Sequence, residues 1–170
     1  MSTFVTVGNT IHPFGRLLAA VEDLARRQLL PQPITVQHGN TPFNSKHCQT
    51  AKFLSLTAFM RHLADADLII CHGGAGTLIQ TLQLHKLPVV VARSAQYQEM
   101  IDDHQSQLVR ALAEAKRIIT ATPSDLLDGI RAWRAATGSP PGPPTMGPLV
   151  RMIADELERQ ATTVAESGNS

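Results

Sequence analysis

A glycine-rich heptapeptide, Cys71–Thr77, is the part of the sequence best suited to chemistry. It reads Cys-His-Gly-Gly-Ala-Gly-Thr and joins an apolar run, Asp67–Cys71, to a segment of helical period. Glycines let the backbone pass close to a ligand, and the free N–H groups of a first helical turn attract anions. The heptapeptide is therefore a candidate diphosphate site; the alternative is that its glycines serve tight packing of a strand on a helix. Its spacing matches neither the P-loop motif nor the dinucleotide-binding GxGxxG motif.

Two other segments carry polar groups next to predicted elements. Gly8–Thr10 follows the first apolar run and is either a second anion-binding turn or a plain turn. Asp102–Gln105 places two carboxylates, an imidazole and an amide together at a predicted helix start. Such groups hydrogen-bond well to sugar hydroxyls. The alternative is that Asp102 or Asp103 only caps the helix.

The histidines give one candidate base and no metal site. His12 lies near the first loop and is either a general base or ordinary polar surface. The others, His38, His47, His62 and His85, have no partners at metal-ligand spacing, so we expect no bound metal. No Ser-His-Asp arrangement is visible either.

Composition narrows the class of protein. The 170 residues suit a single domain, and 43% hydrophobic against 17% charged residues provides a real core. A formal net charge of +1 gives no general attraction to nucleic acid, which we do not expect as a partner. There is no signal peptide pattern and no apolar run near the about 20 residues that span a bilayer. We therefore expect a soluble, cytoplasmic protein.

Cysteines and the larger aromatic residues point to packing. The two cysteines, Cys48 and Cys71, form no CxxC pair, which argues against a disulfide scaffold or a cysteine-rich zinc site. Cys71 ends an apolar run, so we expect it to be a small buried residue. Trp133 is expected in the core, and Tyr97 is expected to line a pocket or an interface.

Short apolar runs alternate with longer segments of helical period. The pattern predicts strands at Thr3–Val7, Ile34–Gln37, Asp67–Cys71, Leu87–Ala92 and Arg117–Ile119, with at most a short one near Lys52–Leu54. It predicts helices from Pro13 to about Gln28, at Leu56–Ala64, at Thr77–Lys86, at about His104–Ala115, and one that Thr122 caps and Pro123 begins. This order gives an α/β fold, a parallel sheet with helices on both faces, whose ligands bind at the carboxyl ends of the strands.

The chain divides into four parts by composition. Residues 1–137 form the predicted domain, and residues 138–148 hold five prolines and three glycines, which predicts an extended linker. Residues 149–162 have the apolar spacing of an amphipathic helix that must pack on something, and residues 163–170 read as a flexible tail.

Taken together, these motifs resemble a known family. The sequence FVTVG near the start, HGGAGT after the third strong strand and DDHQ about thirty residues later are similar to the C-terminal, nucleotide-sugar-binding half of GT-B glycosyltransferases of family 28. The closest resemblance is to the stand-alone small subunit of two-subunit enzymes, including exopolysaccharide glycosyltransferases. It covers about Thr3 to Ile130 and implies a Rossmann-like fold.

The resemblance implies a role for particular positions. His72 and the turn that follows it would hold the diphosphate of a UDP-sugar, and Thr77 would add its hydroxyl. Arg93 and Ser94 would lie near the base or the phosphates. The UDP-sugar-binding residues implied are Gly8, Asn9, Thr10, His72, Gly73, Gly74, Ala75, Gly76, Thr77, Gln80, Arg93, Ser94, Asp103, His104 and Gln105. Gln80 departs from the family, which often has an acidic residue there to grip the ribose hydroxyls; an amide holds a diol less strongly.

The resemblance also implies a partner. A GT-B active site lies between two Rossmann-like halves, and this chain has the length for one. The expected enzyme is a UDP-sugar-dependent hexosyltransferase that acts with a membrane-associated acceptor-binding subunit on a polyprenyl-diphosphate-linked acceptor. That subunit would bring the cytoplasmic chain to the inner face of the membrane, through the Gly8–Phe14 region or the Leu149–Gln160 helix. Alone, the chain is expected to self-associate. UDP-sugar is a substrate, so no cofactor is expected.

Two other functions fit less well. One is a nucleotide-sugar-binding or scaffold module without catalysis, which the amide at Gln80 favours. The other is a sugar-nucleotide 2-epimerase, which needs both halves in one chain and is excluded by length.

Overall fold

The structure is a computed structural model that describes residues 1–99 and 104–137, with the backbone alone for 104–107. The predicted linker, C-terminal helix and tail lie outside the described residues. The strands are β1 (Thr3–Thr6), β2 (Ile34–Gln37), β3 (Gln49–Ala51), β4 (Leu68–His72), β5 (Val89–Val91) and β6 (Ile119–Ala121). The helices are α1 (Gly15–Arg26), α2 (Leu56–Asp65), α3 (Ala75–Gln83), α4 (His104–Glu114) and α5 (Leu126–Ala136), with a 3-10 turn, η1, at Ala95–Tyr97.

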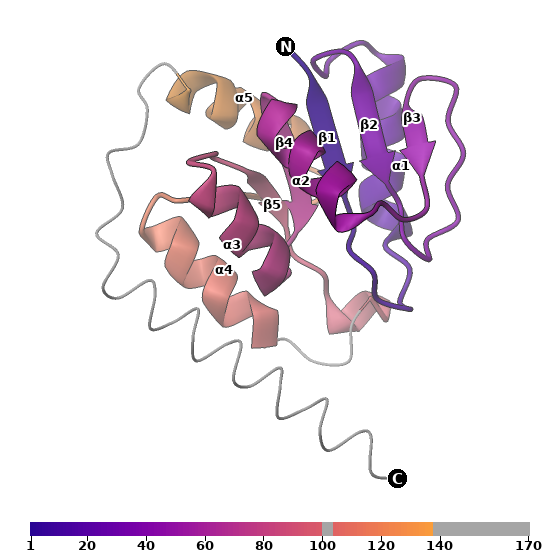
Figure 1. Cartoon of the computed structure of the whole chain (residues 1–170). Coiled ribbons are helices and arrows are strands. Elements are labelled where there is room, and N and C mark those ends of the chain that lie inside the picture. Colours follow the sequence, from indigo (N-terminus) through magenta and orange to yellow (C-terminus); the bar gives the residue numbers. More distant parts are fainter. Residues whose placement is uncertain (100–103, 138–170) are drawn as a thin grey trace, which may run out of the picture.

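All strand pairs are parallel, and the sheet order is β3-β2-β1-β4-β5-β6. This is the order of a Rossmann-like sheet, so the predicted fold class is confirmed (Figure 1). The chain reverses its direction of winding between β1 and β4. In register, Thr6 of β1 pairs with Gln37 on one side and Cys71 on the other. The loops after these three strands therefore meet at one edge of the sheet.

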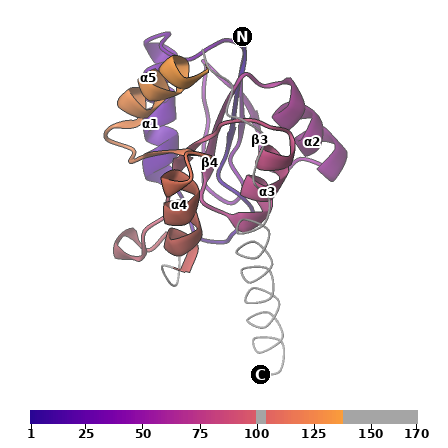
Figure 2. The same ribbon diagram turned by 90° about the vertical axis from the view of Figure 1, so that its left-hand side faces the viewer.

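Helices cover both faces of the sheet. Figure 2 shows α1 and α5 on one side and α2 and α3 on the other. The core divides accordingly into two clusters, one with side chains of α1 and α5 and one with side chains of α2, α3 and α4. Burial of both sheet faces explains why β4 is apolar almost throughout.

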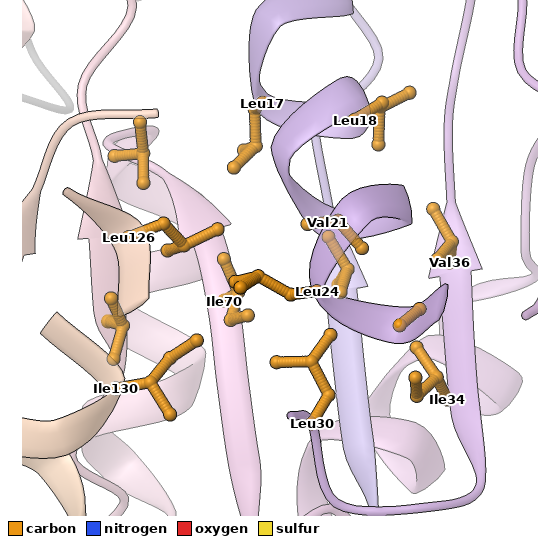
Figure 3. Close-up of a cluster of buried hydrophobic side chains, with 14 of the residues drawn as sticks. Leu17, Leu18, Val21, Leu24, Leu30, Ile34, Val36, Ile70, Leu126 and Ile130 are labelled. Carbon is orange, nitrogen blue, oxygen red and sulfur yellow. The ribbon is translucent and has the colours of Figure 1, made fainter. Parts of the chain in front are cut away.

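The helical period of the sequence produces the α1 face directly. Leu17, Leu18, Val21 and Leu24 are buried and point at the sheet, where Val36 and other strand residues meet them (Figure 3). Two packing predictions are confirmed as well, because Cys71 and Trp133 are fully or almost fully buried.

Some predicted boundaries were wrong. Helix α5 begins at Leu126 and not at Pro123, because the Asp125 carboxylate accepts from the backbone N–H of Thr122 and forms a separate turn. Helix α3 begins at Ala75, two residues earlier than predicted. Strands β3 and β6 are displaced from Lys52–Leu54 and Arg117–Ile119 because pairing with β2 and β5 fixes their position, which a three-residue strand does not reveal by its own pattern.

Candidate functional site

A cavity of about 320 Å³ opens at the carboxyl edge of the sheet, beside β1, where the direction of winding switches between β1 and β4. Ligands of open α/β sheets bind at such a point. Its walls come from the loops after β1 and β3, from the end of β2, and from α2 and α3. The lining residues are Thr6, Gly8, Asn9, Gln37, Leu54, Leu56, Phe59, Gly76, Thr77 and Gln80. Five of the predicted site residues therefore lie together here: Gly8, Asn9, Gly76, Thr77 and Gln80.

The glycines of the turn after β4 have two different purposes. A Cβ on Gly73 would lie 2.6 Å from Cγ2 of Val109, and a Cβ on Gly74 would collide with Nε2 of His72. Packing alone therefore requires glycine at these two positions, and their predicted contact with a diphosphate stays a prediction. A Cβ on Gly76 would meet nothing within 4 Å, and Gly76 lines the cavity. Only Gly76 leaves its space open to a ligand.

The start of α3 presents unpaired backbone donors to the cavity. Gly74 is the N-cap and has no side chain that could accept from the first turn. The amides of Ala75, Gly76 and Thr77 have no partner inside the helix, as in any first helical turn. Gly76 and Thr77 line the cavity, so the positive end of the helix dipole lies beside it. This is the geometry of an anion site.

His72 is a neutral spacer between two turns. Its side chain is 9% exposed, and its ring fills the space that a Cβ on Gly8 or Gly74 would need. Burial, with the nearby charge of Arg93, lowers the pKa of His72 to about 4, against a smaller effect of the Thr6 backbone. Its Nδ1 has no well-formed hydrogen bond with a described residue. In this structure the ring is therefore neutral at pH 7, and a neutral imidazole can still donate one hydrogen bond.

A buried glutamine that the sequence analysis missed orders the first loop. Thr6 Oγ1 donates to Gln37 Oε1 over 2.7 Å, and Gln37 Nε2 donates to Asn9 Oδ1 over 2.9 Å. Gln37 is 3% exposed and lines the cavity. The available signal was a polar residue at the carboxyl end of a buried strand, where the sequence suggested only a strand end.

The remaining residues of the first loop do not line the cavity. The amide of Asn40 donates to the backbone carbonyls of Asn9 and Thr10. The backbone carbonyl of His12 accepts from Arg93, and the His12 side chain is half-buried. The predicted role of His12 as a base is untested by this geometry and stays a prediction.

Arg93 and Ser94 contact the protein itself. Arg93 is 6% exposed and donates to the backbone carbonyls of Val7 (2.6 Å), His12 (2.8 Å) and Glu99 (2.9 Å). Burial lowers the pKa of Arg93 to about 10, and the Glu99 carboxylate opposes this effect. The Ser94 N–H donates to Glu99 Oε2. Contact of Arg93 or Ser94 with a ligand stays a prediction, as does contact with the donor sugar at the start of α4. Of those sugar contacts, Asp103 lies outside the described residues, and only the backbone of His104 and Gln105 is described.

The cavity also has an apolar wall that the sequence analysis missed. Leu54 from the loop after β3 and Leu56 and Phe59 from α2 form it. Leu56 is 69% exposed. An apolar wall beside an anion site suits a ligand with a flat base and a phosphate group.

The described part of the chain has neither a metal-binding cluster nor a membrane-spanning helix. Residues 1–99 and 104–137 hold no group of three histidine, cysteine or acidic side chains that could bind a metal ion. Within the same residues, no helix has the length and hydropathy to cross a membrane.

Comparison with known proteins decides the family. The sequence model of the glycosyltransferase family 28 C-terminal domain matches residues 2–136. The chain belongs to this family. Its resemblance to the stand-alone small subunits is also confirmed: UDP-N-acetylglucosamine transferase subunit ALG13 of Yarrowia lipolytica is 25% identical over 146 residues, which cover 79% of this chain and 71% of that one.

Solved structures agree on the fold of this family 28 domain. An ALG13 solution structure superposes with a TM-score of 0.55 at 21% identity, over 86% of this chain and 91% of that one. MurG of Acinetobacter baumannii gives a TM-score of 0.55 at 23% identity, over 76% of this chain. The match spans only 40% of MurG, so this family 28 chain corresponds to less than half of that protein.

Proposed function

We propose that the chain is the donor-binding subunit of a two-subunit glycosyltransferase that moves a sugar from a UDP-sugar to a polyprenyl-diphosphate-linked acceptor, in exopolysaccharide or glycolipid synthesis. One observation carries the proposal: a single cavity joins the amino end of α3 to an apolar wall at the switch point of the sheet. Family membership and the likeness to ALG13 support it.

The cavity suggests how the donor sits. The amides of Gly76 and Thr77 face the diphosphate, Leu54 and Phe59 pack on the base, and Gln80 reaches the ribose. The described residues that line the cavity include no lysine or arginine. The diphosphate charge is therefore balanced by the helix dipole and by neutral donors.

Catalysis in this arrangement is electrostatic. The bond from the sugar to the diphosphate breaks as the acceptor hydroxyl attacks, and the charge that develops on the diphosphate is stabilised by the α3 amides and Thr77. A base accepts the hydroxyl proton; His12 is our candidate for it. N-acetylglucosamine is the first sugar to test, because ALG13 is named for it.

The acceptor-binding half is proposed to be a second, membrane-associated polypeptide. Two large apolar side chains are exposed on segments that follow the carboxyl ends of strands: Ile11 in the first loop is 79% exposed, and Tyr97 in η1 is 53% exposed. They lie on segments that Arg93 ties together through the carbonyls of His12 and Glu99. These loops are our candidate for the partner contact.

Calorimetric titration of the purified chain with UDP, with ADP and GDP as controls, tests the donor site. We expect saturable binding of UDP alone. Thr77→Val removes one hydroxyl at constant shape and should weaken binding about 5- to 20-fold, as expected for one hydrogen bond to a charged group. Thr57→Val is the matched control, because Thr57 lies in the first turn of α2, is exposed and does not line the cavity.

Two outcomes would contradict the proposal. If neither the chain nor its complex with the natural partner binds UDP, the donor site is wrong. If the complex binds UDP-sugar but transfers no sugar, the chain is a nucleotide-sugar-binding or scaffold module, the second candidate that Gln80 favours.

A further inference from the structure

A buried carboxylate outside the cavity joins two distant segments. Glu99 is 3% exposed and accepts from Arg16 Nε (2.8 Å) and Nη2 (2.7 Å). It also accepts from the backbone N–H of Ser94 over 3.1 Å. Arg16 lies in the first turn of α1, so this bidentate pair fastens the segment after β5 to the start of the helix that follows the first loop. Such charge-assisted pairs are the stronger class of hydrogen bond.

Arg93 extends the connection to both ends of the first loop. Its Nη2 donates to the carbonyl of Val7, where the loop begins, and its Nη1 donates to the carbonyl of His12, near its end. The same Nη1 donates to the carbonyl of Glu99. The Arg93 guanidinium also lies 4.8 Å from the centre of the Phe14 ring. One side chain therefore holds the loop at two points and ties it to the segment that carries Glu99.

Charge links the two arginines through Glu99. Arg93 is buried, and its positive charge needs compensation there. The negative charge of the Glu99 carboxylate stabilises the charged forms of both Arg93 and Arg16. Tyr97 covers the outer side, with the Arg16 guanidinium 3.7 Å from the centre of its ring.

We propose that Glu99 is a positioning residue for the donor, which acts through Arg16 and Arg93 to fix residues 7–14 against the cavity. Gly8 and Asn9 of that loop line the cavity, so the position of the loop sets the shape of one wall. The inference rests on the proposed function for the nature of the ligand. In this proposal Arg93 holds the first loop in place, whereas the sequence motifs suggested that it lies near the ligand.

The test replaces Glu99 in the full chain. Glu99→Gln keeps the shape but removes the charge, and we expect UDP to bind at least about tenfold more weakly. Glu114→Gln is the matched control, because it breaks the exposed Arg110–Glu114 pair of α4 and should leave UDP binding unchanged. Arg16→Lys keeps the charge without the bidentate geometry, so we expect an intermediate loss. Thermal unfolding of each variant shows whether the domain is intact.

Hydrogen exchange followed by mass spectrometry gives a readout that needs no ligand. The amides of Gly8, His12 and Phe14 donate to side chains of Thr6, Thr10 and Thr41. In Glu99→Gln we expect faster exchange in residues 7–14 and unchanged exchange in β4. A general rise in exchange across the chain would show a merely structural role and overturn the proposal.

The two measurements separate the possible failures. If neither the wild-type chain nor its complex with the natural partner binds UDP, the donor assignment fails, and the exchange experiment alone decides whether Glu99 fixes the loop. If the wild type binds UDP and Glu99→Gln binds it equally well, Glu99 does not position the donor site, whatever the exchange shows.

Discussion

The two loops that meet at the cavity are ordered in different ways. The turn after β4, at Gly73 and Gly74, is held by close packing: Gly73 lies against the side chain of Val109, and Gly74 lies against the ring of His72. The first loop, residues 7–14, is held by hydrogen bonds from side chains of other segments. Those side chains are Gln37, Asn40, Thr41 and Arg93.

The two loops therefore differ in the kind of substitution that disrupts them. Close packing around Gly73 and Gly74 leaves no room for an added methyl group, so the cost of a substitution there is steric and large. The first loop depends on several hydrogen bonds, each of modest net value, so its order is lost in steps. His72 is the point of contact, since its ring lies against both Gly8 and Gly74.

The largest effect is expected where both kinds of constraint meet. Gly8 has a φ of +76°, and a Cβ there would lie 2.5 Å from Cε1 and Nε2 of His72. Gly8→Ala should lower the free energy of unfolding by about 2 to 5 kcal/mol, from left-handed strain plus overpacking. Urea denaturation measures it. Gly15→Ala is the control, because a Cβ at Gly15 meets nothing within 4 Å.

A double variant checks the cause of that loss. If the His72 ring is responsible, Gly8→Ala should cost less in a His72→Ala background than in the wild type, by about 1 to 3 kcal/mol of coupling. Equal costs in both backgrounds would mean that the two loops do not meet through the ring.

The buried ring of His72 also makes the stability of the fold depend on pH. Burial holds the pKa of His72 at about 4, below its ordinary value of 6.5. Between these values the unfolded chain binds more protons than the folded one, so stability falls as pH falls from 6.5 toward 4. From pH 7 to pH 5 the wild type should lose about 2 kcal/mol more than His72→Gln, which cannot titrate. If urea denaturation shows the same loss of unfolding free energy from pH 7 to pH 5 in both proteins, His72 is not buried as a neutral ring.

The same contrast explains what could be predicted from the sequence. The sheet, its helices and the HGGAGT turn were predictable because hydrophobic period and glycine spacing are local signals. Gly76 and Thr77 do line the cavity, as the motif indicated. Gln37 was missed because its importance comes from register, which places it opposite Thr6 of β1.

Long-range side-chain contacts were beyond the sequence for a related reason. The sequence motifs placed Arg93 near the base or the phosphates, which stays a prediction, and they gave no sign of its bonds to Val7 and His12, which span 86 and 81 residues of chain. Arg16 and Glu99, 83 residues apart, gave no signal at all. The predicted start of α5 was also wrong, because Thr122 and Asp125 are both good capping residues, and the Asp125 carboxylate instead accepts from the backbone N–H of Thr122 in a separate turn.

A smaller effect is expected from the first loop alone. Gln37→Leu fills nearly the same space but leaves the buried Thr6 hydroxyl without its acceptor and Asn9 without its donor. It should lower the free energy of unfolding by about 1 to 2 kcal/mol and weaken UDP binding. Urea denaturation and calorimetry measure the two effects. The matched change on β2 is Thr35→Val, since Thr35 is half-buried and does not line the cavity; an equal loss of UDP binding there would contradict a specific role for Gln37.

Gly76→Ala should have the smallest effect on stability and a large effect on UDP binding. A methyl group there meets no atom of the protein and replaces glycine in a helix, so Gly76→Ala should raise the free energy of unfolding by about 0.5 kcal/mol. The same methyl group enters the space beside the α3 amides, so UDP should bind at least about tenfold more weakly. Gly15→Ala, which also adds a methyl group at a helix start, should leave binding unchanged. If Gly76→Ala is stabilised but binds UDP as tightly as the wild type, the diphosphate does not lie beside the α3 amides, because the added methyl group would otherwise weaken its binding.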